Sequence, residues 1–238
     1  YKRQLMTVTR RNLLKHSIGG LALATGITTV RAADAPLKDG AWDEETDVLV
    51  VGSGFAGLMA AYEARKAGAS VIVLEKMATA GGNSIINGGI MGVPGTEIQK
   101  RKGIQDSPEL MAADMMKAGL NMNYPDKVKA LCEGAYPAIQ WLESIGVKFK
   151  DEVGTATGAL WQRSHYPSTP SGNSYIRVFE KYIAAHPNIR VITDIEAKDI
   201  LKNAEGRVTG VLAKDNKTGR YTLFTAEKGV IIATGGFG

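Results

Sequence analysis

The sequence has little cysteine, few aromatic residues and no run of apolar residues long enough to cross a membrane. One cysteine is present among 238 residues, and aromatic residues make up 7% of the chain. A single cysteine excludes an internal disulfide, a Cys-x-x-Cys redox pair and an iron–sulfur cluster held by cysteines of this chain. We expect Cys132 to be a buried thiol that packs as a small apolar side chain.

An excess of positive charge is also missing once the first 34 residues are set aside. The chain has 29 basic and 24 acidic residues, which gives a formal net charge of +5. Residues 1–34 contain six of the basic side chains and one acidic side chain, which leaves 23 of each sign in the remainder. A neutral body offers no basic surface to a phosphate backbone, so we expect no nucleic-acid partner.

Residues 1–34 have the pattern of a twin-arginine export signal. The pair Arg10-Arg11 precedes Asn-Leu-Leu-Lys and an uncharged stretch at 17–30. This stretch is shorter than the roughly 20 residues of a membrane helix, so we expect cleavage within 32–35 and no stable membrane anchor. An amphipathic N-terminal helix is the alternative. Because this export machinery carries folded proteins, often with a cofactor inside, the pattern predicts a periplasmic protein with a bound redox cofactor.

The most informative segment follows a polar linker at 35–46. Residues 47–51 form a short apolar run typical of a strand in a buried parallel sheet, and Gly-Ser-Gly-Phe-Ala-Gly follows at 52–57. A helical pattern then covers 58–66, and a second apolar run covers 70–74. A strand, a G-x-G-x-x-G turn, a helix and a second strand in this order predict a dinucleotide-binding βαβ unit.

Three glycines and one acid carry the chemistry of this unit. Gly52 makes the tight turn, Gly54 lets the backbone approach a pyrophosphate, and Gly57 permits close packing of helix on strand. The N–H groups of the helix N-terminus point at the phosphates. Glu75 lies 23 positions after the first glycine, close to the ~20 expected for the acid that binds the ribose hydroxyls.

The segment after Glu75 favours a flavin over a nicotinamide dinucleotide. A nicotinamide-binding domain normally continues with another βα unit, whereas this chain has paired glycines at 81–82 and 88–89. Because glycine has no side chain, a flat ring can lie close to the backbone at these positions. We therefore interpret the cofactor as FAD.

At these residues the sequence resembles the flavoprotein subunits of the fumarate reductase and succinate dehydrogenase superfamily. It is most similar to the soluble, flavocytochrome c type of periplasmic fumarate reductase and its relatives that act on other α,β-unsaturated acids. The resemblance implies an α/β, glutathione-reductase-like Rossmann fold over residues 47–238, with a helical insertion and a small antiparallel β-layer. It also implies that this segment is the N-terminal portion of the FAD-binding domain, ahead of a capping domain with the catalytic arginine and histidines. We name no catalytic residue and no metal ligand in the chain.

The resemblance implies a set of FAD-binding residues. Those near the first glycine turn would bind the pyrophosphate and the ribose, those of the second glycine-rich segment would line the isoalloxazine and ribityl groups, Ile195 would meet the adenine, and the Ala-Thr-Gly turn would pass the phosphates. The set is Gly52, Ser53, Gly54, Ala56, Gly57, Glu75, Lys76, Gly82, Asn83, Ser84, Gly88, Gly89, Ile195, Ala233, Thr234 and Gly235.

The loop before the second glycine pair contains no histidine. Membrane-bound members of the superfamily carry covalent FAD on a histidine in this loop, whereas residues 81–87 have none. We therefore expect non-covalent FAD. His165 and Arg163 are the only candidates for substrate-side groups in this chain. We favour instead a structural hydrogen bond for His165 and a solvated position on the surface for Arg163.

The resemblance implies an exported enzyme of anaerobic respiration that reduces an enoate such as fumarate, urocanate or methacrylate. Electrons would come from a separate cytochrome c or flavin protein. Other flavoenzymes with this fold, a 3-ketosteroid dehydrogenase or an L-aspartate oxidase, are alternatives. A flavin-binding electron carrier, or an inactive truncated fragment, is the alternative of another class.

The region between the cofactor segments has helical patterns. Ser107 is an expected N-cap with proline at the next position, and a second apolar period begins at Asp126. Four methionines at helical spacing are expected to be core residues rather than cofactor ligands; they are Met111, Met115, Met116 and Met122. Short apolar runs then predict the antiparallel β-layer, at 189–192, 200–201, 208–212 and 221–224.

Overall fold

The structure, a computed structural model, describes residues 43–156, 159–169 and 171–236. The expected export signal at 1–34 and most of the expected linker lie outside the described residues. The described residues divide into two compact units, one within 1–80 and 188–238 and the other within 81–187. We call these the first and the second unit and describe each by itself.

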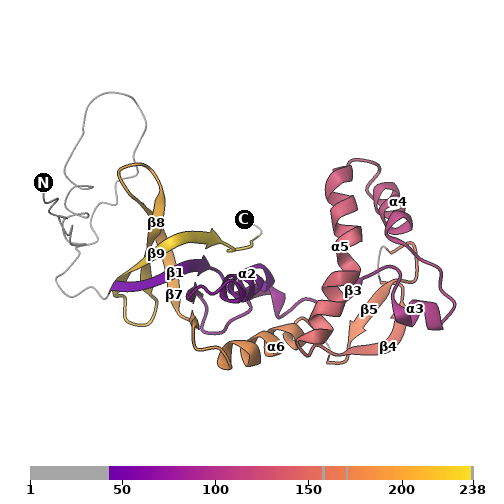
Figure 1. Cartoon of the computed structure of the whole chain (residues 1–238), viewed down its shortest axis with the longest axis horizontal. Coiled ribbons are helices and arrows are strands. Elements are labelled where there is room, and N and C mark those ends of the chain that lie inside the picture. The colour runs from indigo at the N-terminus through magenta and orange to yellow at the C-terminus, as the bar shows by residue number, and fades with distance from the viewer. Residues whose placement is uncertain (1–42, 157–158, 170, 237–238) are drawn as a thin grey trace, which may run out of the picture. The chain divides into compact units, whose positions relative to one another are not determined.

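The first unit is built on one mixed sheet of six strands in the order β6-β2-β1-β9-β8-β7. Figure 1 labels β1, β9, β8 and β7 of this sheet. Strands β6, β2, β1 and β9 run parallel to one another, and β7 and β8 form an antiparallel meander with β9. The strands are β1 (Asp43–Val51), β2 (Val71–Leu74), β6 (Ile189–Ile192), β7 (Ile195–Lys202), β8 (Val208–Asp215) and β9 (Tyr221–Ile232). The predicted α/β fold with a small antiparallel layer is confirmed.

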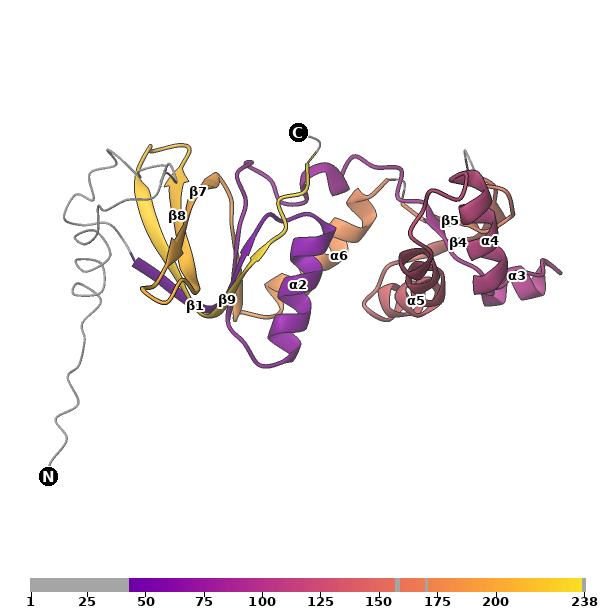
Figure 2. The same ribbon diagram turned by 90° about the horizontal axis from the view of Figure 1, so that it is seen from above.

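The helix α2 (Phe55–Lys66) connects β1 to β2 and completes the predicted βαβ unit. It buries Leu58 and Ala61, and small side chains on this face allow the helix to lie against the sheet. Arg65 and Lys66 stand in its last turn, where positive charge stabilises the negative end of the helix dipole. Figure 2 shows α2 beside β9, and the two elements are in contact.

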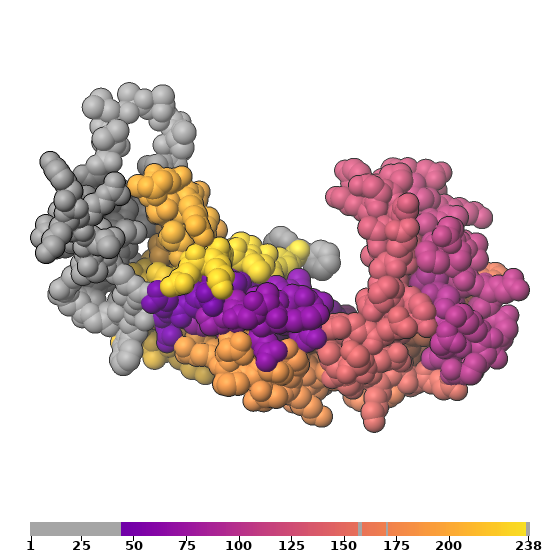
Figure 3. Space-filling view, viewed as in Figure 1, coloured from indigo at the N-terminus to yellow at the C-terminus, as the bar shows by residue number. Residues whose placement is uncertain are grey.

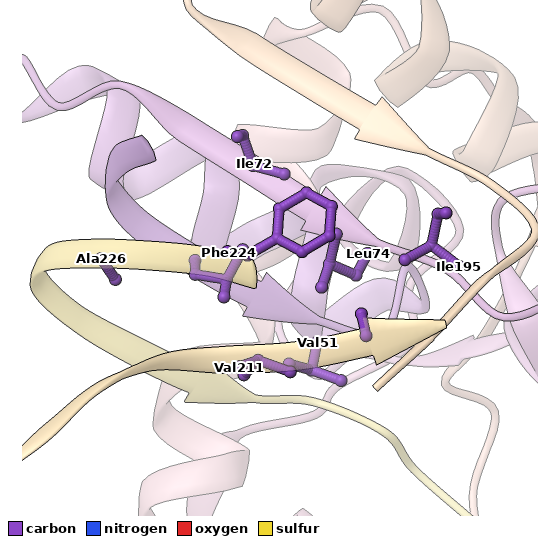
Figure 4. Packing of buried hydrophobic residues seen from close by; sticks show 9 residues of the cluster. Val51, Ile72, Leu74, Ile195, Val211, Phe224 and Ala226 are labelled. Atoms are coloured by element: carbon purple, nitrogen blue, oxygen red, sulfur yellow. The ribbon is translucent and has the colours of Figure 1, made fainter. Parts of the chain in front are cut away.

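The apolar core of the first unit joins the parallel strands to the antiparallel meander. Figure 4 shows its side chains, with the ring of Phe224 at the centre of the group. Every residue of β2 is buried, as expected for a strand covered on both faces. The described cluster consists of Leu49, Val51, Ile72, Leu74, Ile195, Val211, Ala213, Phe224 and Ala226.

Three strand assignments differ from those expected. Residues 189–192, expected in the antiparallel layer, form β6, which pairs parallel to β2. A short β-branched run looks alike in a parallel and in an antiparallel pair. The helix that precedes this run in the chain favours the parallel pair. Strand β1 begins at Asp43, so residues 43–46 belong to the sheet and not to a linker. The expected run at 221–224 is the first part of one longer strand, β9, which continues to Ile232.

The C-terminal part of β9 lies at the surface of the first unit. Its residues 229–232 pair with β1, yet the side chains of Ile231 and Ile232 are 38% and 54% exposed. Figure 3 shows the atoms of this strand, in yellow, on the viewed face. Strands of parallel sheets are usually covered on both faces.

The second unit combines helices with a three-stranded antiparallel sheet in the order β3-β5-β4. Figure 2 shows α4 and α5 side by side, and they pack against each other. No helix among the described residues is both long and apolar enough to span a membrane. The elements are η1 (Gly82–Ser84), β3 (Met91–Gly92), α3 (Glu97–Arg101), α4 (Pro108–Ala118), α5 (Pro125–Ser144), β4 (Phe149–Gly154), β5 (Ser164–Pro167) and α6 (Asn173–Ala184).

Two helices of the second unit, α4 and α5, begin at or next to the positions predicted from the sequence. The hydroxyl of Ser107 accepts a hydrogen bond from the backbone N–H of Leu110, with proline at the first helical position, as predicted for α4. The helix α5 begins at Pro125, one residue before the expected position. The short helix α3 begins after Thr96 and has a capping box, which was not predicted from the sequence.

The small core between α4 and α5 contains the single cysteine. Cys132 is buried beside Met111, Met115 and Met116, and burial raises the pKa of its thiol. The expectation for these four residues is confirmed. Met122 is 80% exposed, so the expectation for it is wrong. The helix ends at residue 118, and two residues with positive φ turn the chain before Met122.

Candidate cofactor-binding site

The turn between β1 and α2 has no room for side chains at two of its glycines. Gly52 has a φ of +104°, and a Cβ there would lie 2.3 Å from the carbonyl oxygen of Ala233. A Cβ on Gly57 would lie 1.9 Å from the carbonyl oxygen of Gly52. The backbone N–H of Ala233 donates to Val51 at 2.8 Å. The glycine turn and the chain after β9 therefore approach each other closely, as predicted for a βαβ phosphate turn.

The N-terminus of α2 is suited to an anion. Its N-cap, Gly54, is extended, no side chain caps the helix, and no acidic residue stands in the first turn. The helix dipole and the N–H groups at such an end favour negative charge. The glycine cradle and this helix end fit the pyrophosphate of a dinucleotide. Ala56 is exposed in the same turn.

Glu75 stands at the C-terminal end of β2, where its carboxylate reaches the glycine turn. Its Oε2 accepts hydrogen bonds from the backbone N–H of Ser53 at 3.1 Å and from the Ser53 hydroxyl at 2.5 Å. Its Oε1 accepts from the backbone N–H of Met77 at 2.8 Å. The side chain is 95% buried by these contacts. Three backbone and side-chain donors thus hold the acid beside the phosphate turn, which fits the role of the ribose-binding acid.

The remaining predicted residues of the first unit differ in their accessibility. Thr234 and Gly235 are exposed in the turn after β9, where Gly235 has a φ of +61°. Lys76 is exposed. Ile195 is buried in the core, and its backbone N–H donates to the carbonyl of Glu75 at 2.8 Å. That N–H is not open to an adenine while this hydrogen bond persists.

The predicted flavin-lining residues lie in the second unit, in a loop held by its own backbone. Gly82 and Gly89 have positive φ values of 47° and 72°. Asn87, which the sequence analysis did not single out, organises the loop. Its amide donates to the carbonyl of Ser84 at 2.5 Å and accepts from the N–H of Gly89 at 2.6 Å. Asn83 and Gly88 are exposed.

The start of α6 supports this loop. The backbone N–H of Gly172 donates to Asn87, and a Cβ on Gly172 would lie 1.8 Å from the carbonyl oxygen of Ser84. The hydroxyl of Tyr175 donates to the carbonyl of Gly89 at 2.6 Å. Tyr175 is 4% exposed, and burial raises its pKa to about 12. A helix that the sequence analysis did not predict therefore fixes the glycine-rich loop.

Replacing Tyr175 tests this support. Tyr175→Phe leaves the Gly89 carbonyl without its donor, and we expect the free energy of unfolding to fall by about 1–3 kcal/mol. Because the folded-state pKa lies above the ordinary value near ~10, the neutral phenol stabilises the fold below about pH 10, and this contribution is lost as pH rises towards 12. Urea unfolding at pH 7 and pH 10.5 measures both effects. An unchanged pH dependence in the variant would contradict the assignment.

Arg163 and His165 are structural residues in the second unit. The Arg163 guanidinium is 6% exposed and forms ion pairs with Asp106 and Asp114 at 2.9 and 2.8 Å, so its predicted surface position is wrong. Two carboxylates more than 45 positions away in sequence compensate the buried charge. His165 is fully buried between the carbonyl of Arg163 and the hydroxyl of Thr96. Its predicted structural hydrogen bond is confirmed, and burial lowers the pKa of the ring.

Known proteins are similar in sequence to most of this chain. A family model described as FAD binding domain matches residues 47–238. The chain belongs to this FAD-binding family. It is 40% identical over 195 residues to a urocanate reductase of Eggerthella lenta and 39% identical over 195 residues to a cytochrome-type fumarate reductase of Shewanella frigidimarina. The predicted membership of the fumarate reductase and succinate dehydrogenase flavoprotein superfamily is thereby confirmed.

A solved structure supports the fold of this FAD-binding chain. The open conformation of a flavocytochrome c3 fumarate reductase superposes with a TM-score of 0.74 at 36% identity, covering 82% of this chain and 34% of that one. The alignments with the urocanate and fumarate reductases likewise cover 82% of this chain but only 32% and 34% of those proteins. The chain thus spans about a third of the length of the curated relatives it matches.

Proposed function

We propose that the full-length protein is an exported flavoenzyme that reduces the double bond of an α,β-unsaturated carboxylate. The observation that carries this proposal is the 39–40% identity to urocanate and fumarate reductases over the βαβ unit and the glycine-rich loop. Both of those names describe reduction of a carbon–carbon double bond conjugated to a carboxylate. The chemistry that FAD supplies when bound is hydride transfer to such a bond.

The residues of this chain bind and orient the cofactor. Gly52, Gly54 and Gly57 form the pyrophosphate cradle at the N-terminus of α2. The carboxylate of Glu75 accepts hydrogen bonds from the ribose hydroxyls. Because a 2′-phosphate would place a second negative charge against the Glu75 carboxylate, the site discriminates against phosphorylated ribose. Residues 82–89 provide a loop with little side-chain bulk for the isoalloxazine and ribityl groups.

The attachment of FAD is proposed to be non-covalent. The loop at 81–87 has no histidine to form a covalent link. The electron donor is proposed to be a separate cytochrome c or flavin protein, because one cysteine and no Cys-x-x-Cys-His motif leave this chain without an iron–sulfur cluster or a covalent haem of its own. The Arg10-Arg11 pattern supports export to the periplasm.

Enzyme assays on the purified full-length protein test the reaction. Reduced methyl viologen serves as the electron donor, and its oxidation is followed with fumarate, urocanate and methacrylate as separate acceptors. We expect one enoate to raise the oxidation rate at least about 100-fold over the rate without acceptor. Failure of all three, together with oxidation of a 3-ketosteroid or L-aspartate, would contradict the proposal. A Gly57→Ala protein controls for viologen oxidation that does not depend on the cofactor site.

A further inference from the structure

The turn between β8 and β9 contacts the chain directly after Glu75. This turn covers residues 215–219, and its Asn216 side-chain amide donates to the carbonyl of Lys76 at 3.1 Å. The backbone N–H of Asn216 donates to the carbonyl of Asp194 at 2.7 Å. One residue of the turn therefore holds two segments of the first unit that are more than 100 positions apart in sequence.

Asp194 completes the contact through an unusual backbone conformation. Its φ is +61°, a region that residues with a side chain rarely adopt, although Asp and Asn tolerate it better than most. Its N–H donates to the carbonyl of Met77 at 3.0 Å, and its carboxylate pairs with the ammonium of Lys217 at 2.6 Å. Two backbone hydrogen bonds and one ion pair hold Asp194 in this conformation.

The turn itself is preorganised. The carboxylate oxygen Oδ1 of Asp215 accepts hydrogen bonds from the backbone N–H groups of Lys217 and Thr218 at 2.8 and 2.9 Å. Gly219 follows with a φ of +74°, which closes the turn. A turn fixed by its own hydrogen bonds loses little conformational entropy when it holds other segments.

These contacts lead to the carboxylate of Glu75. Met77, whose carbonyl is held by Asp194, donates its own N–H to Glu75 Oε1 at 2.8 Å. The carbonyl of Glu75 accepts from the N–H of Ile195, the residue after Asp194. The turn and Asp194 therefore fix the backbone at the two residues that directly follow the acid facing the glycine cradle.

We propose that residues 215–219, with Asp194, are a positioning element for the adenosine half of FAD. This inference rests on the proposed function, because it requires that Glu75 bind the ribose. Asn216, Lys217 and Asp194 act through Glu75 and are not themselves cofactor ligands. The element sets the affinity for the dinucleotide without entering the reaction.

The test measures FAD affinity of the full-length protein with Asn216→Ala. Loss of the amide removes the hydrogen bond to the Lys76 carbonyl, and we expect the Kd for FAD to rise about tenfold. The kcat and the KM for the enoate at saturating FAD, and the Tm of the apoprotein, should stay at their wild-type values. Lys217→Met, at a side chain that is 70% exposed, provides a second variant that is expected to fold and to raise the Kd about threefold.

A matched control lies in the other turn of the meander. Asn203, in the turn between β7 and β8, accepts a hydrogen bond from the N–H of Arg207 and has no contact with Glu75 among the described hydrogen bonds. Asn203→Ala should leave the Kd for FAD unchanged. Equal Kd values for Asn216→Ala and wild type would overturn the positioning role, while the proposed function would stand. An equal rise in Kd for both asparagine variants, or a lower Tm and kcat together, would also overturn it in favour of a merely structural turn. Wild-type protein that binds no FAD would instead overturn the proposed function.

Discussion

Gly57→Ala is expected to weaken FAD binding severely and to lower the free energy of unfolding by about 3 kcal/mol. The added Cβ would stand 1.9 Å from the carbonyl oxygen of Gly52. The carbonyl oxygen is a backbone atom and the Cβ is bonded directly to the backbone of α2, so no flexible side chain can yield. The helix must move away from the turn, and the phosphate cradle opens. Equilibrium unfolding and titration with FAD measure the two losses, and we expect the Kd to rise at least about 100-fold.

Gly134→Ala is the matched control, because it is the same substitution in another helix. Nothing lies within 4 Å of a Cβ built on Gly134 in α5. Alanine there is expected to stabilise the helix by about 0.5–1 kcal/mol and to leave FAD binding unchanged. If Gly57→Ala bound FAD as tightly as Gly134→Ala, the close packing of α2 on the glycine turn would not be a requirement of the site.

Arg163→Met is expected to destabilise the protein by about 3–5 kcal/mol. The guanidinium pairs with Asp106, whose side chain is fully buried, and with Asp114, whose side chain is 22% exposed. Removing the arginine leaves the buried Asp106 carboxylate without a cationic partner, with only the neutral donors of Gln99 and the Ser107 N–H beside it. Urea unfolding at pH 7 measures the loss.

Arg101→Met controls for the loss of an arginine at the surface. Arg101 pairs with Asp151 at 2.6 Å, but the two side chains are 59% and 74% exposed. Exposed pairs contribute about 0–1 kcal/mol, so this variant should stay close to wild type. Equal destabilisation of Arg163→Met and Arg101→Met would contradict a structural role for the buried network.

The parts of the fold that local sequence determines were predictable. The order of strand, glycine turn, helix and strand around Gly52 depends on contiguous residues, and so does the serine-and-proline start of α4. Glu75 followed from its spacing to the glycines. Each of these features arises from interactions within about 25 positions in the chain, so the pattern of residue types carries them.

The parts that depend on distant partners were not predictable. The burial of Arg163 is decided by Asp106 and Asp114, which no spacing rule connects to it. The parallel pairing of β6 depends on the long connection from β2, which contains the whole second unit and ends in α6. Asn87 and Asn216 look like ordinary loop residues, and their roles become visible only when the carbonyl groups that they contact are placed in space.

The absorption spectrum of the purified full-length protein, taken before and after acid precipitation, tests the central claim most directly. The account predicts absorption near ~450 nm that moves into the supernatant, which shows FAD held without a covalent bond. Colour that stays in the pellet would contradict non-covalent binding. A folded protein without colour, which also takes up no added FAD, would contradict the assignment of the glycine turn and Glu75 as an FAD site.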